Sequence, residues 1–195
     1  TRSWNSSFGR VSSSVTLTNA AARTRTVTSI APDGSYSVST YQDGRLLSSA
    51  QYDANGLITA WTSHAYDAHG RQTGVTAWRP AGGAAGASGA IPGGPEGQWS
   101  SGGGAGAEPL PLTTVTACDD ADRVVSVTSP DPDGDGPQAP QVTAYAYDNR
   151  GRRSTTTLPD GGVVNYTYWP TGELRRTWGT RVYPVEYSYD AAGRV

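Results

Sequence analysis

The fold is decided by the stretch Tyr145-Ala146-Tyr147-Asp148-Asn149-Arg150-Gly151-Arg152, whose pattern recurs further along the sequence. Equal steps along the chain lead from Tyr147 to Tyr168 and then to Tyr189, and another tyrosine stands two positions before each of them. We call the pattern Tyr-x-Tyr-Asp-x-x-Gly-Arg the repeat motif. Self-similarity at a fixed period of this length is typical of repeat architectures.

The repeat motif predicts a β-hairpin. An aspartate followed three residues later by glycine is typical of a type I turn closed by a left-handed residue, and glycine accepts a positive φ at little cost. Residues before the turn alternate, so Tyr145 and Tyr147 are expected on one face of a strand. The β-prone residues 153–158 and 174–178 are expected to be return strands. A second, wider turn is expected at 158–162, which reads Leu-Pro-Asp-Gly-Gly.

The motif residues are predicted to be structural rather than catalytic. We expect each aspartate to cap its turn, and each arginine to pair with that aspartate or to stack on a tyrosine. Catalysis requires one site, whereas these residues recur at turn after turn. The residues to which we assign this role are Tyr52, Asp53, Gly56, Tyr66, Asp67, Gly70, Arg71, Tyr147, Asp148, Gly151, Arg152, Tyr168, Gly172, Tyr189, Asp190, Gly193 and Arg194.

Copies of the motif upstream divide the chain into three segments. Residues 1–79 are predicted to contain degenerate and then clear hairpins, and residues 80–111 a Gly-, Ala- and Pro-rich inserted loop. Residues 112–195 are predicted to contain further hairpins and to end within a repeat. Because Tyr52 and Tyr66 are closer together than the tyrosines of the later motifs, we expect the strands between their motifs to be short.

One copy of the motif is altered at two positions. In Cys118-Asp119-Asp120-Ala121-Asp122-Arg123, cysteine replaces the tyrosine and Asp122 replaces the glycine. Aspartate tolerates the left-handed conformation better than most residues, so we expect the turn to persist. Since this is the only cysteine, an intrachain disulfide and a cysteine-based metal site are excluded.

The composition favours a thin, two-faced sheet over a compact globule. Aliphatic residues are few, while 11 tyrosines and 6 tryptophans are present and many of them stand at regular positions. Cross-strand aromatic and threonine pairs can stabilise a sheet of this kind. The net charge of −2 does not indicate nucleic-acid binding. No run of 18 apolar residues is present, so no membrane span is predicted.

One local motif indicates a candidate calcium site. Asp131, Asp133 and Asp135 alternate before a glycine, as in the first half of a calcium-binding loop. Val142 stands where the bidentate carboxylate of such a loop is expected, and the alternative is an acidic, solvated turn. No other cofactor is predicted. The sequence contains no nucleophile, phosphate-loop or zinc-hydrolase motif, so we expect no enzymatic activity.

Exposed aromatic residues leave a binding function open. Tyrosines at the regular spacing are expected to pair across strands, each pair contributing roughly 0.2–1 kcal/mol. Trp99 and Trp169 stand off that spacing and are therefore the better candidates for glycan contacts.

The motif between Tyr145 and Val195 resembles the YD repeat, or RHS repeat, of bacterial polymorphic toxins, insecticidal toxin complexes and teneurins. The resemblance implies an all-β fold in which tandem antiparallel hairpins form a curved, spiralling sheet, part of a hollow shell. It implies a non-catalytic segment of a secreted or cell-surface bacterial protein, whose shell scaffolds or encloses a C-terminal toxin. The expected partners are that cargo or neighbouring repeats of the same chain. The alternative is an adhesion module that binds carbohydrate or a cell-surface protein.

Overall fold

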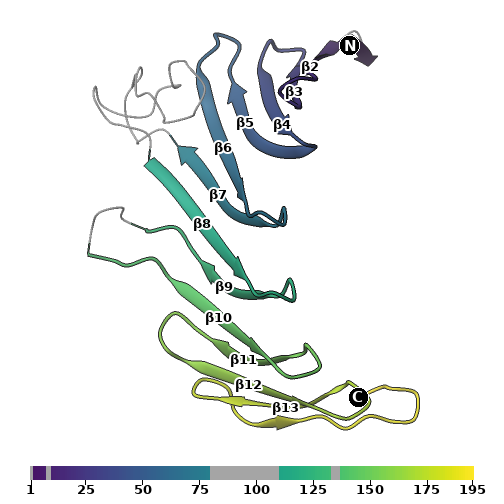
Figure 1. Ribbon diagram of the computed structural model, residues 1–195, viewed down its shortest axis with the longest axis vertical. Helices are drawn as coiled ribbons and strands as arrows, with labels where there is room; N and C mark the ends of the chain where they lie inside the picture. The colour runs from purple at the N-terminus through teal and green to yellow at the C-terminus, as the bar shows by residue number, and fades with distance from the viewer. Residues whose placement is uncertain (1, 8–9, 80–109, 133–136) are drawn as a thin grey trace. The chain divides into compact units, whose positions relative to one another are not determined.

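The computed structural model describes residues 2–7, 10–79, 110–132 and 137–195. In this part of the chain all regular structure is β, and 14 strands follow one another in the sheet in the order of the sequence (Figure 1). The strands are β1 (Arg2–Ser7), β2 (Arg10–Asn19), β3 (Thr24–Ile30), β4 (Tyr36–Gln42), β5 (Arg45–Tyr52), β6 (Ile58–Tyr66), β7 (Gln72–Arg79), β8 (Leu110–Cys118), β9 (Val124–Thr128), β10 (Val142–Tyr147), β11 (Arg153–Thr157), β12 (Val163–Tyr168), β13 (Leu174–Gly179) and β14 (Val185–Glu186).

The prediction of an all-β fold built from tandem antiparallel hairpins is confirmed. The spiral of the whole ribbon stays a prediction. No helix among the described residues is long and apolar enough to cross a membrane. The expected insertion lies outside the described residues except for 110 and 111, which belong to β8.

The chain divides into two compact units, Thr1–Thr113 and Thr114–Val195. In the first unit, the register between paired strands shifts by one residue at Tyr52 and Tyr66, the motif tyrosines that end β5 and β6. The same irregularity occurs in the second unit at Cys118, Tyr147 and Tyr168. The extra residue is the bulge expected where a type I turn is followed by a left-handed residue.

The motif at Tyr52 lies at the opposite end of the sheet from the motif at Tyr66. β6 is a full strand of nine residues between them, so the expectation of short strands was wrong. Because consecutive turns of an antiparallel meander alternate between its two ends, motifs separated by one strand lie at opposite ends. The longer spacing from Tyr147 to Tyr168 spans two strands, β11 and β12, and returns the motif to the same end. The Tyr52 motif therefore neighbours the turn 31–35, which joins β3 to β4.

The turn 158–162, which was predicted to be wider than the motif turn, has the same two backbone hydrogen bonds as the motif turn 148–152. The predicted difference between the two kinds of turn was therefore also wrong. In the turn 148–152, the N–H of Asp148 donates to the carbonyl of Arg152 (2.8 Å), and the N–H of Gly151 donates to the carbonyl of Asp148 (3.0 Å). In the turn 158–162 the corresponding bonds are 2.7 and 2.9 Å long. Those of the turn 31–35 are 2.8 and 3.0 Å long.

The core is small, as the composition predicted. In the first unit Ala50, Ile58 and Trp61 are buried, and Tyr52 and Trp78 pack against them. Ile58 is fully buried, with an exposed fraction of 0%. The buried side chains described in the second unit are two threonines on neighbouring hairpins, Thr156 and Thr177. Backbone ladders and polar side-chain contacts must therefore supply much of the stability of the second unit.

Candidate functional site

Each motif turn is built on a left-handed residue in its fourth position. At Gly151 φ is 77°, and at Asp122, which replaces the glycine in the altered copy, φ is 61°. The backbone N–H of each of these residues closes the type I turn onto the carbonyl of the aspartate three residues earlier. Positive φ is found at all the predicted motif glycines, which are Gly56, Gly70, Gly151, Gly172 and Gly193. The turn assignment from sequence is therefore correct at these positions.

The motif aspartate caps its turn with one carboxylate oxygen. In Asp148, Oδ1 accepts hydrogen bonds from the backbone N–H groups of Arg150 and Arg152, each 2.9 Å long. The same pair of bonds is formed by Asp53, Asp67, Asp119 and Asp190, with lengths between 2.8 and 3.0 Å. The expected capping role is therefore confirmed in the four turns for which it was predicted, and Asp119 caps a fifth turn in the same way.

The second oxygen of the aspartate pairs with the arginine of the same turn. Nε of Arg152 lies 2.8 Å from Oδ2 of Asp148, and its Nη2 lies 2.7 Å from the same atom. Equivalent pairs join Asp67 to Arg71, Asp119 to Arg123 and Asp190 to Arg194. Asp119 and Arg123 are not among the predicted motif residues, although their four-residue spacing matches that of the other pairs.

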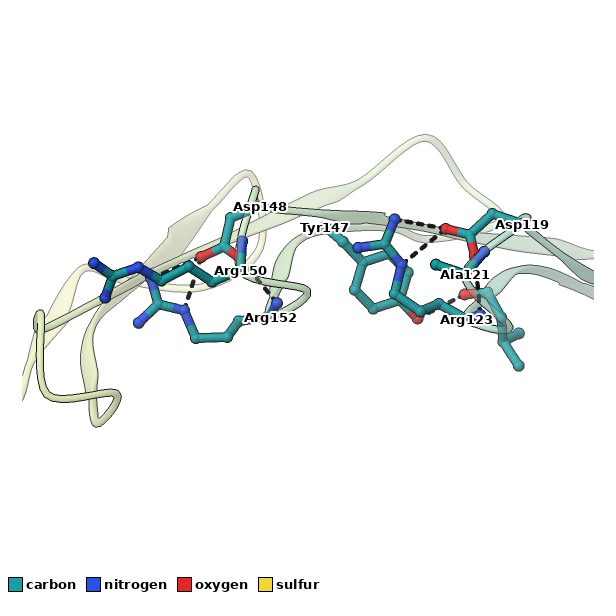
Figure 2. A network of polar contacts seen from close by, with 8 residues as sticks. Asp119, Ala121, Arg123, Tyr147, Asp148, Arg150 and Arg152 are labelled. Atoms are coloured by element: carbon teal, nitrogen blue, oxygen red, sulfur yellow. Dashed lines mark hydrogen bonds and ion pairs between the residues drawn. The ribbon is translucent and has the colours of Figure 1, made fainter.

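The arginine also reaches the next motif turn at the same end of the sheet. In the second unit, the guanidinium of Arg123 lies over the ring of Tyr147 (4.6 Å), and that of Arg152 lies over the ring of Tyr168 (4.6 Å). The tyrosine hydroxyls donate back to the preceding repeat. Tyr147 bonds to the carbonyl of Val124 (2.7 Å), and Tyr168 bonds to that of Arg153 (2.8 Å). Figure 2 shows the guanidinium of Arg123 beside the ring of Tyr147. It also shows the pairs Asp119–Arg123 and Asp148–Arg152.

We call this series of linked turns the Asp–Arg–Tyr ladder. It extends to Tyr189, whose hydroxyl donates to the carbonyl of Leu174 (3.0 Å). In the first unit the arginine–tyrosine contact recurs at Arg45, which lies over the ring of Tyr66 (5.8 Å), and the Tyr66 hydroxyl donates to the carbonyl of Leu46 (2.9 Å). The aspartate of that turn, Asp43, pairs with Arg23 instead. Stacking of arginine on tyrosine was predicted and is confirmed. The tyrosine, however, belongs to the following repeat, so the contact joins two hairpins.

These contacts lower the pKa of the four aspartates that pair with an arginine. For Asp119, hydrogen bonds from the side chain and backbone of Arg123 hold the pKa below the usual value. For Asp148, burial acts to raise the pKa, but hydrogen bonds from Arg152 and Arg150 outweigh this effect and lower it. The pKa values of Asp67 and Asp190 are lowered chiefly by the backbone N–H groups of Arg71 and Arg194. All four carboxylates are therefore ionised at neutral pH.

A dependence of stability on acid pH follows from these shifts. Because the pKa is lower in the folded protein than in the unfolded chain, the ion pairs contribute their full stability above the unfolded value of about 4. That stability is lost as the pH falls through the lowered pKa. We expect Asp148→Asn to lower the melting temperature at pH 7, and the difference from the unmodified chain to shrink as the pH approaches 2. Thermal unfolding followed by circular dichroism measures this, and a difference that is constant across that range would contradict the prediction.

The turn at Tyr168 departs from the motif. Trp169 replaces the aspartate and Glu173 replaces the arginine, yet the backbone bonds of the turn are retained. Arg152 and Arg150 donate to the carbonyls of Trp169 (3.2 Å) and Pro170 (2.9 Å) in this turn. The arginines of one turn thus bind the backbone of the next even where the carboxylate is lost.

The indole of Trp169 is held between repeats. Its Nε1 donates to the carbonyl of Tyr187 (3.2 Å), and the guanidinium of Arg175 lies 4.7 Å from the ring centre. The side chain keeps an exposed fraction of 37%. A glycan contact at Trp169 stays a prediction, and any sugar would have to approach a ring that already has a guanidinium beside it. Trp99 lies outside the described residues.

The predicted calcium site also falls mainly outside the described residues, because it requires Asp133 and Asp135. Asp131 is described and is partly exposed. In the part of the chain that the structure describes, no group of three His, Cys, Asp or Glu residues is placed to bind a metal ion. Calcium binding stays a prediction.

The sequence matches no protein-family model and no curated protein. Solved structures with which the chain aligns include a TcdB2-TccC3-Cdc42 structure, at 15% identity and a TM-score of 0.34, covering 93% of this chain and 11% of the other. A Photorhabdus luminescens Tc holotoxin pore with a mutation in TccC3 aligns at 15% identity and a TM-score of 0.33, with the same coverage. TcdB2-TccC3 without its hypervariable C-terminal region aligns at 16% identity and a TM-score of 0.30, covering 92% of this chain and 11% of the other. The chain thus spans about a tenth of the length of the chains with which it aligns.

Proposed function

We propose that the chain is a non-catalytic structural segment of a YD-repeat β-shell, in a secreted or cell-surface bacterial protein whose shell scaffolds or encloses a C-terminal toxin. The observation that carries the proposal is the Asp–Arg–Tyr ladder. Arg152 contacts Asp148 in its own turn and Tyr168 in the next, so the residues that define the repeat bind successive hairpins to one another. Such nearest-neighbour contacts suit an extended repeat wall.

The chemistry of the motif supports a structural role over catalysis. A general acid or base works best with a pKa near the operating pH. Four aspartates of these turns have lowered pKa values, and each binds two backbone N–H groups and an arginine; they are Asp67, Asp119, Asp148 and Asp190. Their carboxylates are therefore engaged in holding the turn.

The small core supports a wall rather than a globule. With Thr156 and Thr177 as the buried side chains described in the second unit, the sheet carries polar groups where a globule would carry aliphatic ones. A polar wall can surround a polypeptide without an apolar seal against it, which fits the proposed cargo role. The adhesion alternative rests on the 37% exposure of Trp169.

The test uses the natural full-length product that contains this chain, with two adjacent aspartates as a matched pair. Asp119 lies in the ladder, whereas its neighbour Asp120 is exposed and takes no part in the capping bonds of the turn. We expect Asp119→Ala to increase the rate at which protease cuts the region downstream of the repeats, and Asp120→Ala to leave it unchanged. Equal cutting of that region in the two variants and the unmodified protein would count against enclosure. Binding to a glycan array by the unmodified chain, lost in Trp169→Ala, would favour adhesion instead.

A further inference from the structure

A groove of about 570 Å³ lies in the first unit, at the end of the sheet where the turns 31–35 and 53–57 are neighbours. Its lining includes Ala31, Ser35, Tyr36, Tyr52 and Asp53, together with further serines. The Tyr52 motif stands at this end, whereas the Tyr66 motif of the same unit stands at the other. The groove is therefore next to the Tyr52 motif turn. The turn beside that motif at this end of the sheet is 31–35, which lacks the aspartate and the arginine of the repeat motif at the corresponding positions.

The groove exists because that neighbour lacks the side chains of the ladder. The turns 31–35 and 148–152 have the same two backbone hydrogen bonds, so Ala31 corresponds to Asp148 and Ser35 to Arg152. In the ladder, Arg152 extends over the tyrosine of the next motif. Ser35 is too short to extend over Tyr52 in the same way. The groove thus lies where the ladder of the second unit has a guanidinium.

Asp53 supplies a carboxylate to this groove. Its Oδ1 caps the turn by accepting from the N–H groups of Asn55 (2.9 Å) and Leu57 (2.8 Å). Leu57 occupies the position at which the other motif turns have an arginine. Among the residues that the structure describes, no arginine forms an ion pair with Asp53, whereas Oδ2 of Asp148 has Arg152 within 2.8 Å.

The aromatic wall of the groove is a stacked pair. Tyr36 and Tyr52 face each other across β4 and β5, with ring centres 4.5 Å apart and planes 8° apart. In the described part of the chain no guanidinium lies over either ring. Other aromatic rings at the turns do have one, at distances from 4.4 Å (Arg25 over Tyr41) to 5.8 Å (Arg45 over Tyr66).

We propose that this groove binds the guanidinium group of an arginine side chain on a partner polypeptide. The guanidinium lies against the Tyr36–Tyr52 pair and forms an ion pair with Oδ2 of Asp53. The ladder combines the same two kinds of contact, although there the arginine over Tyr168 pairs with Asp148 of the preceding turn. Charge complementarity selects this occupant over a sugar, because a carboxylate that lacks its cation gains most from a planar cationic donor. The proposal is independent of whether the repeats enclose a cargo.

The direct test is an NMR titration of the isotope-labelled chain, following the ring signals of Tyr36 and Tyr52 and the amide of Asp53. The probe is N-acetyl-arginine amide, and the matched control is N-acetyl-citrulline amide, which has nearly the same shape and no charge. We expect saturable shifts with the arginine compound that are confined to the groove, and weaker or absent shifts with citrulline. Equal responses to the two compounds, or no response to either, would refute the proposal. Shifts with methyl glucoside alone would assign the groove to sugars instead.

Two variants test the geometry. Asp53→Asn retains the oxygen that caps the turn and removes the charge, so binding of the arginine compound should become about fivefold weaker. Ser35→Arg supplies a guanidinium from the chain itself, so it should abolish binding and raise the melting temperature. Asp120→Asn, in the second unit, removes a charge far along the sequence and should leave the affinity unchanged. Unaltered affinity in both groove variants would overturn the assignment.

Discussion

Replacing Trp61 by alanine is expected to lower the free energy of unfolding of the first unit by about 3–5 kcal/mol, the usual cost of truncating a buried tryptophan. Trp61 is 4% exposed and forms the core of this unit with Ala50 and Ile58. It also lies opposite Trp78 on the neighbouring strand, with ring centres 5.6 Å apart. Because the described core contains so few apolar side chains, little else can move in to fill the cavity.

The matched control for this variant is Trp169→Ala, which removes the same side chain from a site where it is 37% exposed. That variant should cost about 1 kcal/mol, since it loses one hydrogen bond and one cation–π contact but leaves no cavity. Urea unfolding gives the free energies, and hydrogen exchange identifies which strands are affected. Faster exchange in β5, β6 and β7 is expected for Trp61→Ala. Equal losses of stability in the two variants would show that Trp61 does not form a core.

Gly179→Ala is expected to destabilise the second unit by about 2–3 kcal/mol, at the upper end for insertion of an extra group into a packed site. Gly179 pairs with Val164 across β12 and β13. A Cβ added there would overlap the carbonyl oxygen of Val163, and it would lie 2.9 Å from the carbonyl carbon of Val163 and 3.0 Å from Cα of Val164. These are backbone atoms, so the two strands must separate locally. The hydrogen bond from the N–H of Thr180 to that carbonyl oxygen would be lost.

Gly161→Ala provides the comparison, because it introduces the same methyl group into the same unit without a clash. Gly161 has a φ of 79° and no atom within 4 Å of the position of an added Cβ. Its substitution should therefore cost only the left-handed backbone strain, about 1–2 kcal/mol. Chemical unfolding should rank Gly179→Ala as the more damaging of the two, with faster hydrogen exchange in β12 and β13. The reverse order would mean that the close approach of the two strands at Gly179 is not maintained in solution.

The motif turns could be predicted residue by residue because their chemistry is local. Asp148 and Gly151 interact within a single turn of the chain, and even the substitution of Asp122 for glycine followed from its tolerance of positive φ. The end of the sheet at which a turn lies is not local information. Tyr52 and Tyr66 have the same motif, but the single strand β6 between them places them at opposite ends. Motif recognition alone treats them as equivalent.

The sequence predicted the contacts that lie within one turn, but not the contacts that join one turn to the next. The arginine of the motif was expected to stack on a tyrosine, but the choice of Tyr168 by Arg152 depends on strand register, which the motif does not specify. The groove was not predicted, because the turn 31–35 has Ala31 and Ser35 where the repeat motif has its aspartate and arginine. Once Ala31 and Ser35 are aligned with Asp148 and Arg152, their short side chains predict an opening beside Tyr52.

The alternation of turns between the two ends of the meander limits how such a gene can change in length. Duplication or deletion of two consecutive strands moves each later motif along the ribbon and keeps it at its original rim, that is, at the same end of the strands. Loss of a single strand, such as the one between Tyr52 and Tyr66, transfers every subsequent motif to the other rim, where its arginine meets different neighbours. Recombination that preserves the chemistry of both rims must therefore proceed in whole hairpins.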